Sequence, residues 1–333
     1  MDRVRIGLIG CGAFGESHLQ TFRALERAQV AAVYDIDGPR ARHVAQEYGI
    51  PRVCESLEEI CSLPELDAVD VVTSEVEHRE PVTRALAAGR HVFVEKPIAT
   101  TLADCAAIVD AAAQAGRILM VGQILRFETK YAMLKDEVAA GNLGSIVSMH
   151  ARRNRPKNLL ARYNRTHPAL ENAIHDIDLM LWYMGQPVRR VRGYQRYATG
   201  RKNPDTFWGI LEFEGGAIGV VETIWLLPPA AGIMLDDAFQ MIGTQAVANI
   251  QLLPGAYNIL RETGYHVPDF SYDPRVAHTA RGALREELNY FCECVANGRQ
   301  CTAITPAEAV RAIQVVLALI ESAETGKDVE ISS

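Results

Sequence analysis

The sequence predicts an α/β protein with an N-terminal parallel sheet and a C-terminal α+β domain that carries a large, mostly antiparallel open sheet. Strand-like runs rich in Val and Ile alternate with helical patterns through the first 122 residues, as in parallel sheets covered on both faces. Between residues 145 and 250, short strands follow one another across glycine-rich turns, as in hairpins. We therefore expect two domains, 1–122 and 123–333.

Apolar periodicity and turn residues place the individual elements. In the first domain we expect strands at 4–9, 30–35, 52–54, 68–72, 91–94 and 118–121, and helices at 14–27, 39–48, 56–61, 79–88 and 102–115. In the second we expect strands at 146–151, 188–197, 207–213, 217–225, 239–242 and 246–250, and helices at 127–140, 171–184 and 281–297. A last helix follows Thr305-Pro306-Ala307-Glu308, which places an N-cap, Pro at the first helical position and Glu at the third.

A glycine-rich turn joins the first strand to the first helix. Its residues are Gly10, Cys11, Gly12, Ala13, Phe14 and Gly15, in the G-x-G-x-x-G spacing. The three glycines would allow a tight turn, close approach of a pyrophosphate and close packing of the helix on the strand. The start of the helix offers N–H groups and a positive dipole end to phosphate. Any tight strand-to-helix turn favours glycine, so the spacing needs a second signal.

Asp35 supplies that second signal. It ends the next strand, at about the offset that the dinucleotide motif requires, where a carboxylate accepts hydrogen bonds from the adenosine ribose. The same carboxylate would repel a 2′-phosphate, and Ile36-Asp37 follows rather than an arginine. We therefore predict NAD as the cofactor and consider NADP a poorer fit. The alternative is that Asp35 is an ordinary loop residue after a buried strand.

Two further clusters are candidates for chemistry. Glu95-Lys96-Pro97 follows a buried strand, and a lysine at that edge of a sheet can stabilise an alkoxide-like oxygen; a solvated surface lysine is the alternative. His175 shares a helix face with Glu171, Asp178 and Trp182, and histidine is the usual general base near neutral pH. A helix with one buried histidine and an acidic flank is the alternative there.

Taken together, these motifs resemble the Gfo/Idh/MocA family of NAD(P)-dependent oxidoreductases. The resemblance rests on the glycine turn with His18, on Glu95-Lys96-Pro97, and on His175-Asp176-Ile177-Asp178 followed by Trp182. It implies a Rossmann domain, a second domain whose sheet face often builds dimers or tetramers, and hydride transfer at a carbinol carbon of a sugar, cyclitol or nucleotide sugar.

The resemblance also implies residue roles. Lys96 would bind the substrate oxygen and assist proton transfer, and His175 would be the acid/base. The family frequently has Asp four residues before this histidine, where this chain has Glu171, so the reach of that carboxylate differs. Further cofactor contacts are expected from Thr73, Ser74, His78, Glu95 and Lys96, although a capping role fits His78 equally well. Arg126 is expected at the substrate or in a domain-interface salt bridge.

The segment Arg152–Arg165 is the most individual part of the sequence. It contains six basic residues and no acidic residue, in a chain with a net charge of −7. Concentrated arginine favours carboxylate or phosphate, so Arg153, Arg155 and Tyr163 are candidate contacts to an anionic sugar. The alternative is a solvated or oligomer-contacting loop.

Composition narrows the remaining function classes. The acidic chain lacks the basic, aromatic-rich surface of a nucleic-acid partner, and no apolar run approaches the length of a membrane helix. Seven cysteines without a paired framework suggest a cytoplasmic protein, and no metal-ligand spacing is present. We expect a homodimer or homotetramer that acts on a carbohydrate or cyclitol. There are two alternatives. The protein could be a non-catalytic NAD-binding regulator, or an enzyme that uses transient oxidation by NAD for elimination or glycoside cleavage.

Overall fold

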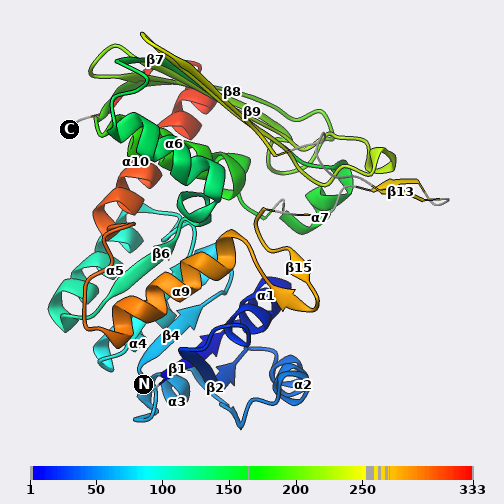
Figure 1. Ribbon diagram of the computed structural model, residues 1–333, viewed down its shortest axis with the longest axis vertical. Helices are drawn as coiled ribbons and strands as arrows, with labels where there is room; N and C mark the ends of the chain where they lie inside the picture. Colours follow the sequence, from blue (N-terminus) through cyan, green and yellow to red (C-terminus); the bar gives the residue numbers. More distant parts are fainter. Residues whose placement is uncertain are drawn as a thin grey trace. The chain divides into compact units, whose positions relative to one another are not determined.

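The protein consists of two compact units in the computed structural model, which describes residues 3–163, 165–252, 259–261, 264–266, 269 and 271–331. The first unit comprises residues 1–128 and 270–310, and the second comprises 129–269 and 311–333. The sequence analysis assigned all of 123–333 to the second domain, whereas 270–310 belongs to the first unit. The late segment does so because α9, drawn in orange in Figure 1, packs on α1 and β1.

A six-stranded parallel sheet forms the centre of the first unit, in the order β3-β2-β1-β4-β5-β6. Its strands are β1 (Val4–Ile9), β2 (Ala28–Tyr34), β3 (Arg52–Val53), β4 (Ala68–Val71), β5 (His91–Glu95) and β6 (Leu119–Gly122). Its helices are α1 (Ala13–Phe22), α2 (Gly38–Tyr48), α3 (Leu57–Ser62), α4 (Arg79–Ala87), α5 (Leu102–Ala115) and α9 (Ala283–Ala296), with a short hairpin of β15 (Arg275–Val276) and β16 (Thr279–Ala280). The inner strands β1, β4, β5 and β6 are almost wholly buried, which explains their continuous apolar runs. This strand order is that of a dinucleotide-binding Rossmann sheet.

The second unit is built on a seven-stranded sheet in the order β12-β11-β7-β10-β9-β8-β17. Its strands are β7 (Ile146–Asn154), β8 (Val188–Arg196), β9 (Thr206–Phe213), β10 (Ile218–Ile224), β11 (Asp236–Gly243), β12 (Val247–Gln251) and β17 (Val329–Glu330). Neighbouring strands run antiparallel except β7 and β10, which are parallel. The predicted mostly antiparallel sheet is thus confirmed, with one parallel pair and a C-terminal edge strand that the sequence analysis did not predict.

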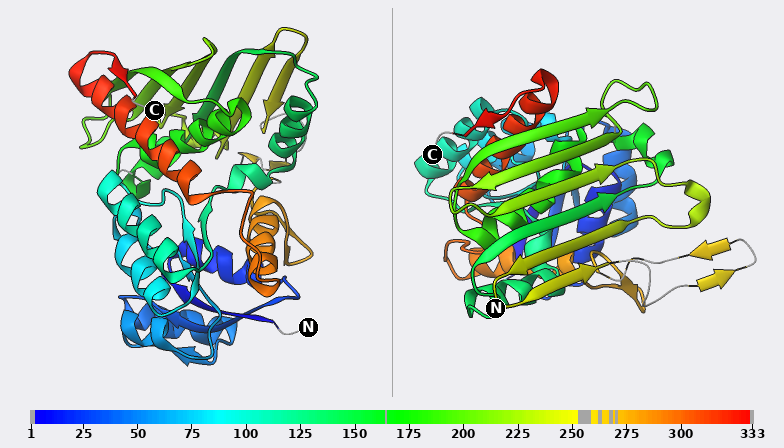
Figure 2. Two further views of the ribbon diagram at one scale, coloured as in Figure 1. Left: turned by 90° about the vertical axis from the view of Figure 1, so that its left-hand side faces the viewer. Right: turned by 90° about the horizontal axis from the view of Figure 1, so that it is seen from above.

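Helices of the second unit cover one face of this sheet. They are α6 (Thr129–Ala139), α8 (Ile174–Met184) and the C-terminal part of α10 (Pro306–Thr325). The unit also contains a single-turn α7 (Leu160–Tyr163) and a separate small hairpin of β13 (Ile259–Arg261) and β14 (Gly264–His266). Close packing depends on glycine: a Cβ on Gly209 or Gly193 would lie within 3.0 Å of α10, and one on Gly219 would lie 2.8 Å from the Met180 sulfur of α8. The opposite face of the strands is seen in the right-hand view of Figure 2.

Element boundaries differ from the sequence analysis in three informative places. Helix α1 ends at Phe22 rather than near residue 27, and β7 continues to Asn154 rather than ending at 151. The expected helix 171–184 is a π-helical turn, Ala169–Ala173, followed by α8. The predicted start of the last helix is confirmed, because Thr305 and Glu308 exchange the hydrogen bonds of a capping box at the beginning of α10.

All seven cysteines are buried and unpaired. No helix of the described residues is long and apolar enough to cross a membrane.

Candidate functional site

The glycine turn is held tightly against the sheet edge. Gly10 has φ +103°, and a Cβ there would lie 2.5 Å from the carbonyl oxygen of Val72. A Cβ on Gly15 would lie 2.1 Å from the carbonyl oxygen of Gly10. Both positions therefore require glycine, for backbone conformation at the first and for helix packing at the second.

Gly12 differs from the other two glycines because nothing lies within 4 Å of the position that its Cβ would occupy. Gly12 is also the N-cap of α1, so no side chain caps the N–H groups of the first helical turn. An open backbone surface at a helix N-terminus fits a pyrophosphate by both shape and charge. The residues of the turn thus fit the dinucleotide that the sequence predicted.

Asp35 lies directly beside this turn. Its Oδ2 accepts the N–H of Cys11 at 2.7 Å, and its Oδ1 accepts the N–H of Asp37 at 2.8 Å. Arg40 approaches the same carboxylate at 3.8 Å from α2. The Cys11 thiol is buried, and burial followed by the Asp35 charge raises its pKa to about 12, so it remains a neutral packing group.

The ends of β4 and β5 are tied together by His78. This buried ring contacts the carbonyl oxygen of Pro97 through Nδ1 at 2.8 Å and that of Thr73 through Nε2 at 3.3 Å. Burial lowers the pKa of His78. The His78 side chain makes no capping hydrogen bond; instead it holds the loop in which Thr73 is partly exposed and Ser74 is exposed.

Lys96 follows β5 at the same carboxyl edge of the sheet. It is partly exposed and precedes a cis peptide bond to Pro97, and its backbone N–H donates to Glu95 Oε2 at 3.2 Å. Phe14 of the glycine turn is exposed, with 42% of its surface accessible. The sheet edge thus presents a glycine turn with open backbone, the carboxylate of Asp35 and the partly exposed Lys96.

The sequence analysis did not predict that His18 and Asp70 form a pair. His18 was noted only through the resemblance, and Asp70 only as a strand residue. Both are completely buried, and His18 Nδ1 lies 2.8 Å from Asp70 Oδ2. A carboxylate in the middle of the apolar strand 68–72 was the available signal, because buried charges are expensive unless paired.

In the second unit, His175 lies in the first turn of α8 and is partly exposed. Glu171 and Asp178, predicted on the same helix face, are both buried. Glu171 belongs to the π-helical turn that precedes α8. The change from π to α geometry alters the spacing between Glu171 and His175, so the simple helical face predicted from the sequence is interrupted at this point.

The arginines at the start of the arginine-rich segment pair with acidic side chains. Arg153 is 1% exposed; it forms a bidentate pair with Asp176 at 2.7 and 2.9 Å, and its Nη1 donates to Asp237 at 2.7 Å. Arg155 pairs with the same Asp237. The expected basic substrate loop therefore begins as an internal strand whose arginines pair with distant carboxylates.

Two further predicted substrate contacts are also held by protein groups. Arg126 is buried, and its Nη1 donates to the carbonyl oxygen of Ala303 at 2.8 Å and to Glu308 at 3.0 Å. This placement matches the salt-bridge alternative, although both partners belong to the first unit. The Tyr163 ring lies 5.6 Å from that of Trp225.

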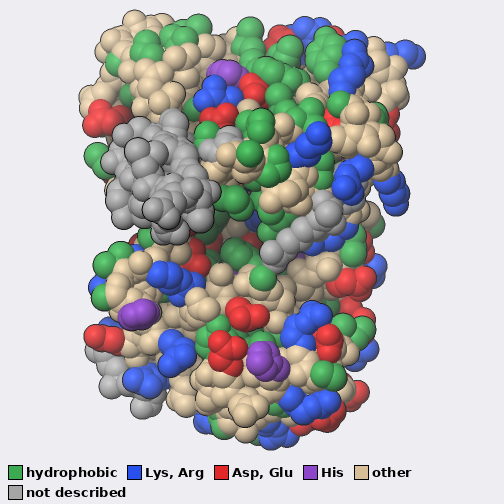
Figure 3. All heavy atoms as spheres, turned by 90° about the vertical axis from the view of Figure 1, so that its right-hand side faces the viewer, with side chains coloured by type: hydrophobic (Ala, Val, Ile, Leu, Met, Phe, Trp, Pro, Cys, Tyr) green, Lys and Arg blue, Asp and Glu red, His purple; other side chains and the backbone are tan. Residues whose placement is uncertain are grey.

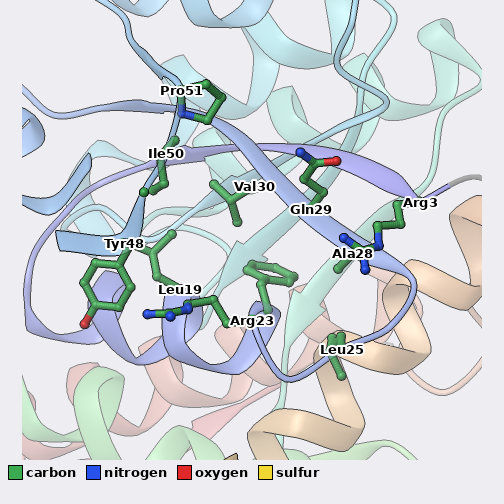
Figure 4. Close-up of a pocket in the computed structure, with 12 residues that line it drawn as sticks. Arg3, Leu19, Arg23, Leu25, Ala28, Gln29, Val30, Tyr48, Ile50 and Pro51 are labelled. Carbon is green, nitrogen blue, oxygen red and sulfur yellow. The ribbon is translucent and has the colours of Figure 1, made fainter. Parts of the chain in front are cut away.

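A cavity of about 270 Å³ in the first unit lies away from this edge. Its lining includes Arg3, Arg23 and Tyr48, together with Ala28, Gln29 and Val30 from the start of β2 (Figure 4). Asp35 lies beyond the other end of that strand. Ligands of open α/β sheets bind at the carboxyl ends of the strands, so the cavity is not the dinucleotide site.

The fold and the site define a dinucleotide-binding oxidoreductase. The model of an oxidoreductase family with an NAD-binding Rossmann fold, Gfo/Idh/MocA, matches residues 4–123, and the model of its C-terminal domain matches residues 131–249. The chain belongs to the Gfo/Idh/MocA family, and it is an enzyme of the dehydrogenase type.

Individual relatives agree with this assignment. Inositol 2-dehydrogenase 2 of Saccharopolyspora erythraea is 30% identical over 97% of this chain and 94% of its own length. Inositol 2-dehydrogenase of Acidothermus cellulolyticus is 35% identical, but that match spans only 61% of this chain and 60% of the relative. The crystal structure of scyllo-inositol dehydrogenase from Lactobacillus casei with bound NAD(H) and scyllo-inositol has the same fold, with a TM-score of 0.86 at 21% identity over 99% of both chains.

Proposed function

We propose that the protein is an NAD-dependent cyclitol dehydrogenase that oxidises one secondary hydroxyl of an inositol, or catalyses the reverse reduction. The observation that carries this proposal is the placement of Lys96 at the same sheet edge as the glycine turn and Asp35. Similarity to an inositol 2-dehydrogenase across nearly the whole chain supports the substrate class.

The chain would hold NAD through groups already described. N–H groups at the start of α1 bind the pyrophosphate beside Gly12, and Asp35 accepts hydrogen bonds from the adenosine ribose. Asp35 also disfavours a 2′-phosphate, which supports NAD over NADP. When bound, the nicotinamide supplies the chemistry of hydride transfer.

Lys96 and His175 divide the handling of the substrate oxygen and its proton. The Lys96 ammonium donates to the oxygen and stabilises the alkoxide-like state that precedes loss of hydride from carbon. His175 removes the hydroxyl proton as the general base, and in the reverse direction it returns that proton. The two residues belong to different units. Mutation of each residue by itself would measure how much it contributes to the rate.

The pairing of the arginine-rich segment supports a neutral polyol rather than an anionic sugar. Arg153 and Arg155 are occupied by Asp176 and Asp237, so a substrate carboxylate or phosphate would compete with buried ion pairs. Initial rates with inositols, neutral sugars, uronates and sugar phosphates test this preference. Higher kcat/KM for an anionic sugar than for every neutral polyol would contradict it.

Replacement of Lys96 by Met tests the catalytic assignment. We expect Lys96→Met to lower kcat for inositol oxidation by about a hundredfold or more, the usual effect of removing a donor to a developing oxyanion. NADH absorbance gives the rate, and the exposed Lys202→Met is the matched control, with unchanged rates. Equal turnover by wild type and Lys96→Met would overturn the role.

The alternative functions give different results in the same assay. A non-catalytic regulator binds NADH but turns over no polyol in the wild-type form. An enzyme that oxidises its substrate only transiently forms product, measured by chromatography, without net NADH absorbance. The proposed dehydrogenase forms NADH and ketone in equal amounts.

We also propose that the uncovered sheet face joins copies of this chain into a homodimer or homotetramer. Exposed apolar side chains lie on this face: Tyr194 is opposite Trp208, and the exposed Ile210 is opposite the partly buried Val220. Exposed apolar surface marks association sites.

A further inference from the structure

The buried histidine of α1 links the glycine turn to the strand that carries Lys96. His18 has no accessible surface, and its two ring nitrogens face two carboxylates. Nδ1 lies 2.8 Å from Asp70 Oδ2 on β4, and Nε2 lies 3.3 Å from Glu95 Oε1 on β5. The proposed function assigns no task to His18 or Asp70.

Glu95 is confined on its other sides as well. Its Oε2 accepts the backbone N–H of Lys96 at 3.2 Å. Its register partner on β6 is Gly122, where a Cβ would lie 2.7 Å from Glu95 Oε1. The absence of a side chain at Gly122 therefore makes room for the carboxylate, which lies between the ring of His18 and the backbone of Lys96.

The surroundings of His18 favour the protonated ring. Burial opposes its charge, but the carboxylates of Asp70 and then Glu95 outweigh burial and raise the pKa of His18 to about 10. The other close rings are apolar, with Phe14 at 4.9 Å and Phe93 at 5.9 Å between centroids. The Cys292 thiol of α9 stays neutral, because burial raises its pKa.

We propose that His18 is a positioning residue for Lys96: its imidazolium, anchored on Asp70, holds the Glu95 carboxylate against the backbone N–H of Lys96 and thereby fixes where the lysine leaves the sheet edge. This inference rests on the proposed role of Lys96. Small displacements of a catalytic group reduce rates strongly, so a fixed supporting shell affects kcat. The Phe14 ring also packs on His18, but the backbone of the glycine turn is set by its own glycines, so the inference concerns Lys96 alone.

Replacement of His18 by Gln tests the kinetic consequence. We expect His18→Gln to lower kcat about tenfold or more, while KM for NAD changes less than about threefold, because the glycine turn and Asp35 are unchanged. The control is Thr21→Val on the same helix, whose buried hydroxyl donates only to the carbonyl oxygen of Ser17; its kcat should match wild type. Unchanged kcat in folded His18→Gln would overturn the inference.

A double-mutant cycle with Glu95→Gln separates positioning from a general loss of packing. Because His18 acts through Glu95, the double variant should lose little more kcat than either single variant. Fully additive losses would contradict the inference. If His18→Gln does not fold, Glu95→Gln alone provides the comparison, through its kcat and through the protonation of His18.

Nuclear magnetic resonance of ¹⁵N-histidine in the whole protein gives a readout that needs no substrate. An ordinary histidine is neutral at about pH 8.5, whereas we expect both ring nitrogens of His18 to carry protons there and Glu95→Gln to weaken that protonation. A neutral ring in wild type would overturn the inference and leave the proposed function standing. A protonated ring in a protein that oxidises no polyol would instead refute the proposed function.

Discussion

At the residue scale, Asp35 has two kinds of hydrogen-bond partner, one observed in the protein and one proposed in the cofactor. Its carboxylate accepts N–H groups from Cys11 and Asp37, and the same oxygens are the expected acceptors for the adenosine ribose. The first contact shapes the turn, and the second is the one that we propose to favour NAD over NADP.

We predict that Asp35→Ser raises KM for NAD about tenfold, which corresponds to about 1.4 kcal/mol. The ratio of kcat/KM for NADP to that for NAD should rise as well, because the repulsive carboxylate is gone and Arg40 lies nearby. Initial rates with both cofactors provide the measurement, with the exposed Asp110→Asn as control. An unchanged cofactor ratio would contradict the assignment.

At the scale of elements, the start of α8 is anchored to the sheet by buried charge. Asp176, the neighbour of His175, is held bidentately by Arg153 of β7. Asn172, one turn earlier, donates to the Arg153 carbonyl oxygen at 2.9 Å and to Thr223 at 2.8 Å. Backbone and side chain of a single strand residue thus hold the π-helical turn and the helix that presents His175.

Removing Arg153 should therefore affect stability strongly. We predict that Arg153→Met lowers the free energy of unfolding by about 3–5 kcal/mol, because it leaves Asp176 with an uncompensated buried charge, whereas Asp237 keeps its pair with Arg155. The adjacent Arg152→Met is the matched control: Arg152 pairs with Asp236 at 2.9 Å but is partly exposed, so about 1 kcal/mol or less is expected. Denaturant titration compares the two, and equal losses would refute the distinction.

The same elements show what the sequence did and did not predict. Strand β1 and the helix at 102–115 were predicted to the residue, because local periodicity and caps define them. The roles of Arg153 and Arg155 were not predictable, because their partners Asp176 and Asp237 lie 23 to 84 residues away along the chain. A run of basic residues looks the same in the sequence whether its side chains are solvated or paired with buried carboxylates.

At the scale of the whole molecule, the distribution of charged and apolar side chains on the surface bears on how copies of the chain associate. In the lower part of Figure 3, which shows the first unit, Lys and Arg side chains lie beside Asp and Glu side chains. On the sheet face of the second unit, apolar and charged side chains are mixed: Tyr194 is opposite Trp208, but Arg192 is opposite Ile210 and Glu222 is opposite Trp208. The apolar side chains of that face supply the hydrophobic contribution to association.

We predict that Ile210→Asp shifts the protein to a smaller oligomer, because it replaces an exposed apolar side chain of the proposed interface with a charge. Size-exclusion chromatography with light scattering measures the mass, and Gln114→Asp on an exposed position of α5 is the control. A wild-type protein that is already monomeric would contradict the proposed interface.

The return of residues 270–310 to the first unit has a consequence for biosynthesis. Leu284, Leu288 and Phe291 of α9 are completely buried, and Phe93 of β5 packs on Phe291 with 5.6 Å between ring centroids. A ribosome therefore releases all six strands of the nucleotide-binding sheet long before it releases the helix that covers them. The emerging N-terminal half must wait, with apolar surface uncovered, until six of the seven strands of the second sheet have been translated. Chaperones have their best opportunity to bind the nascent chain during that interval.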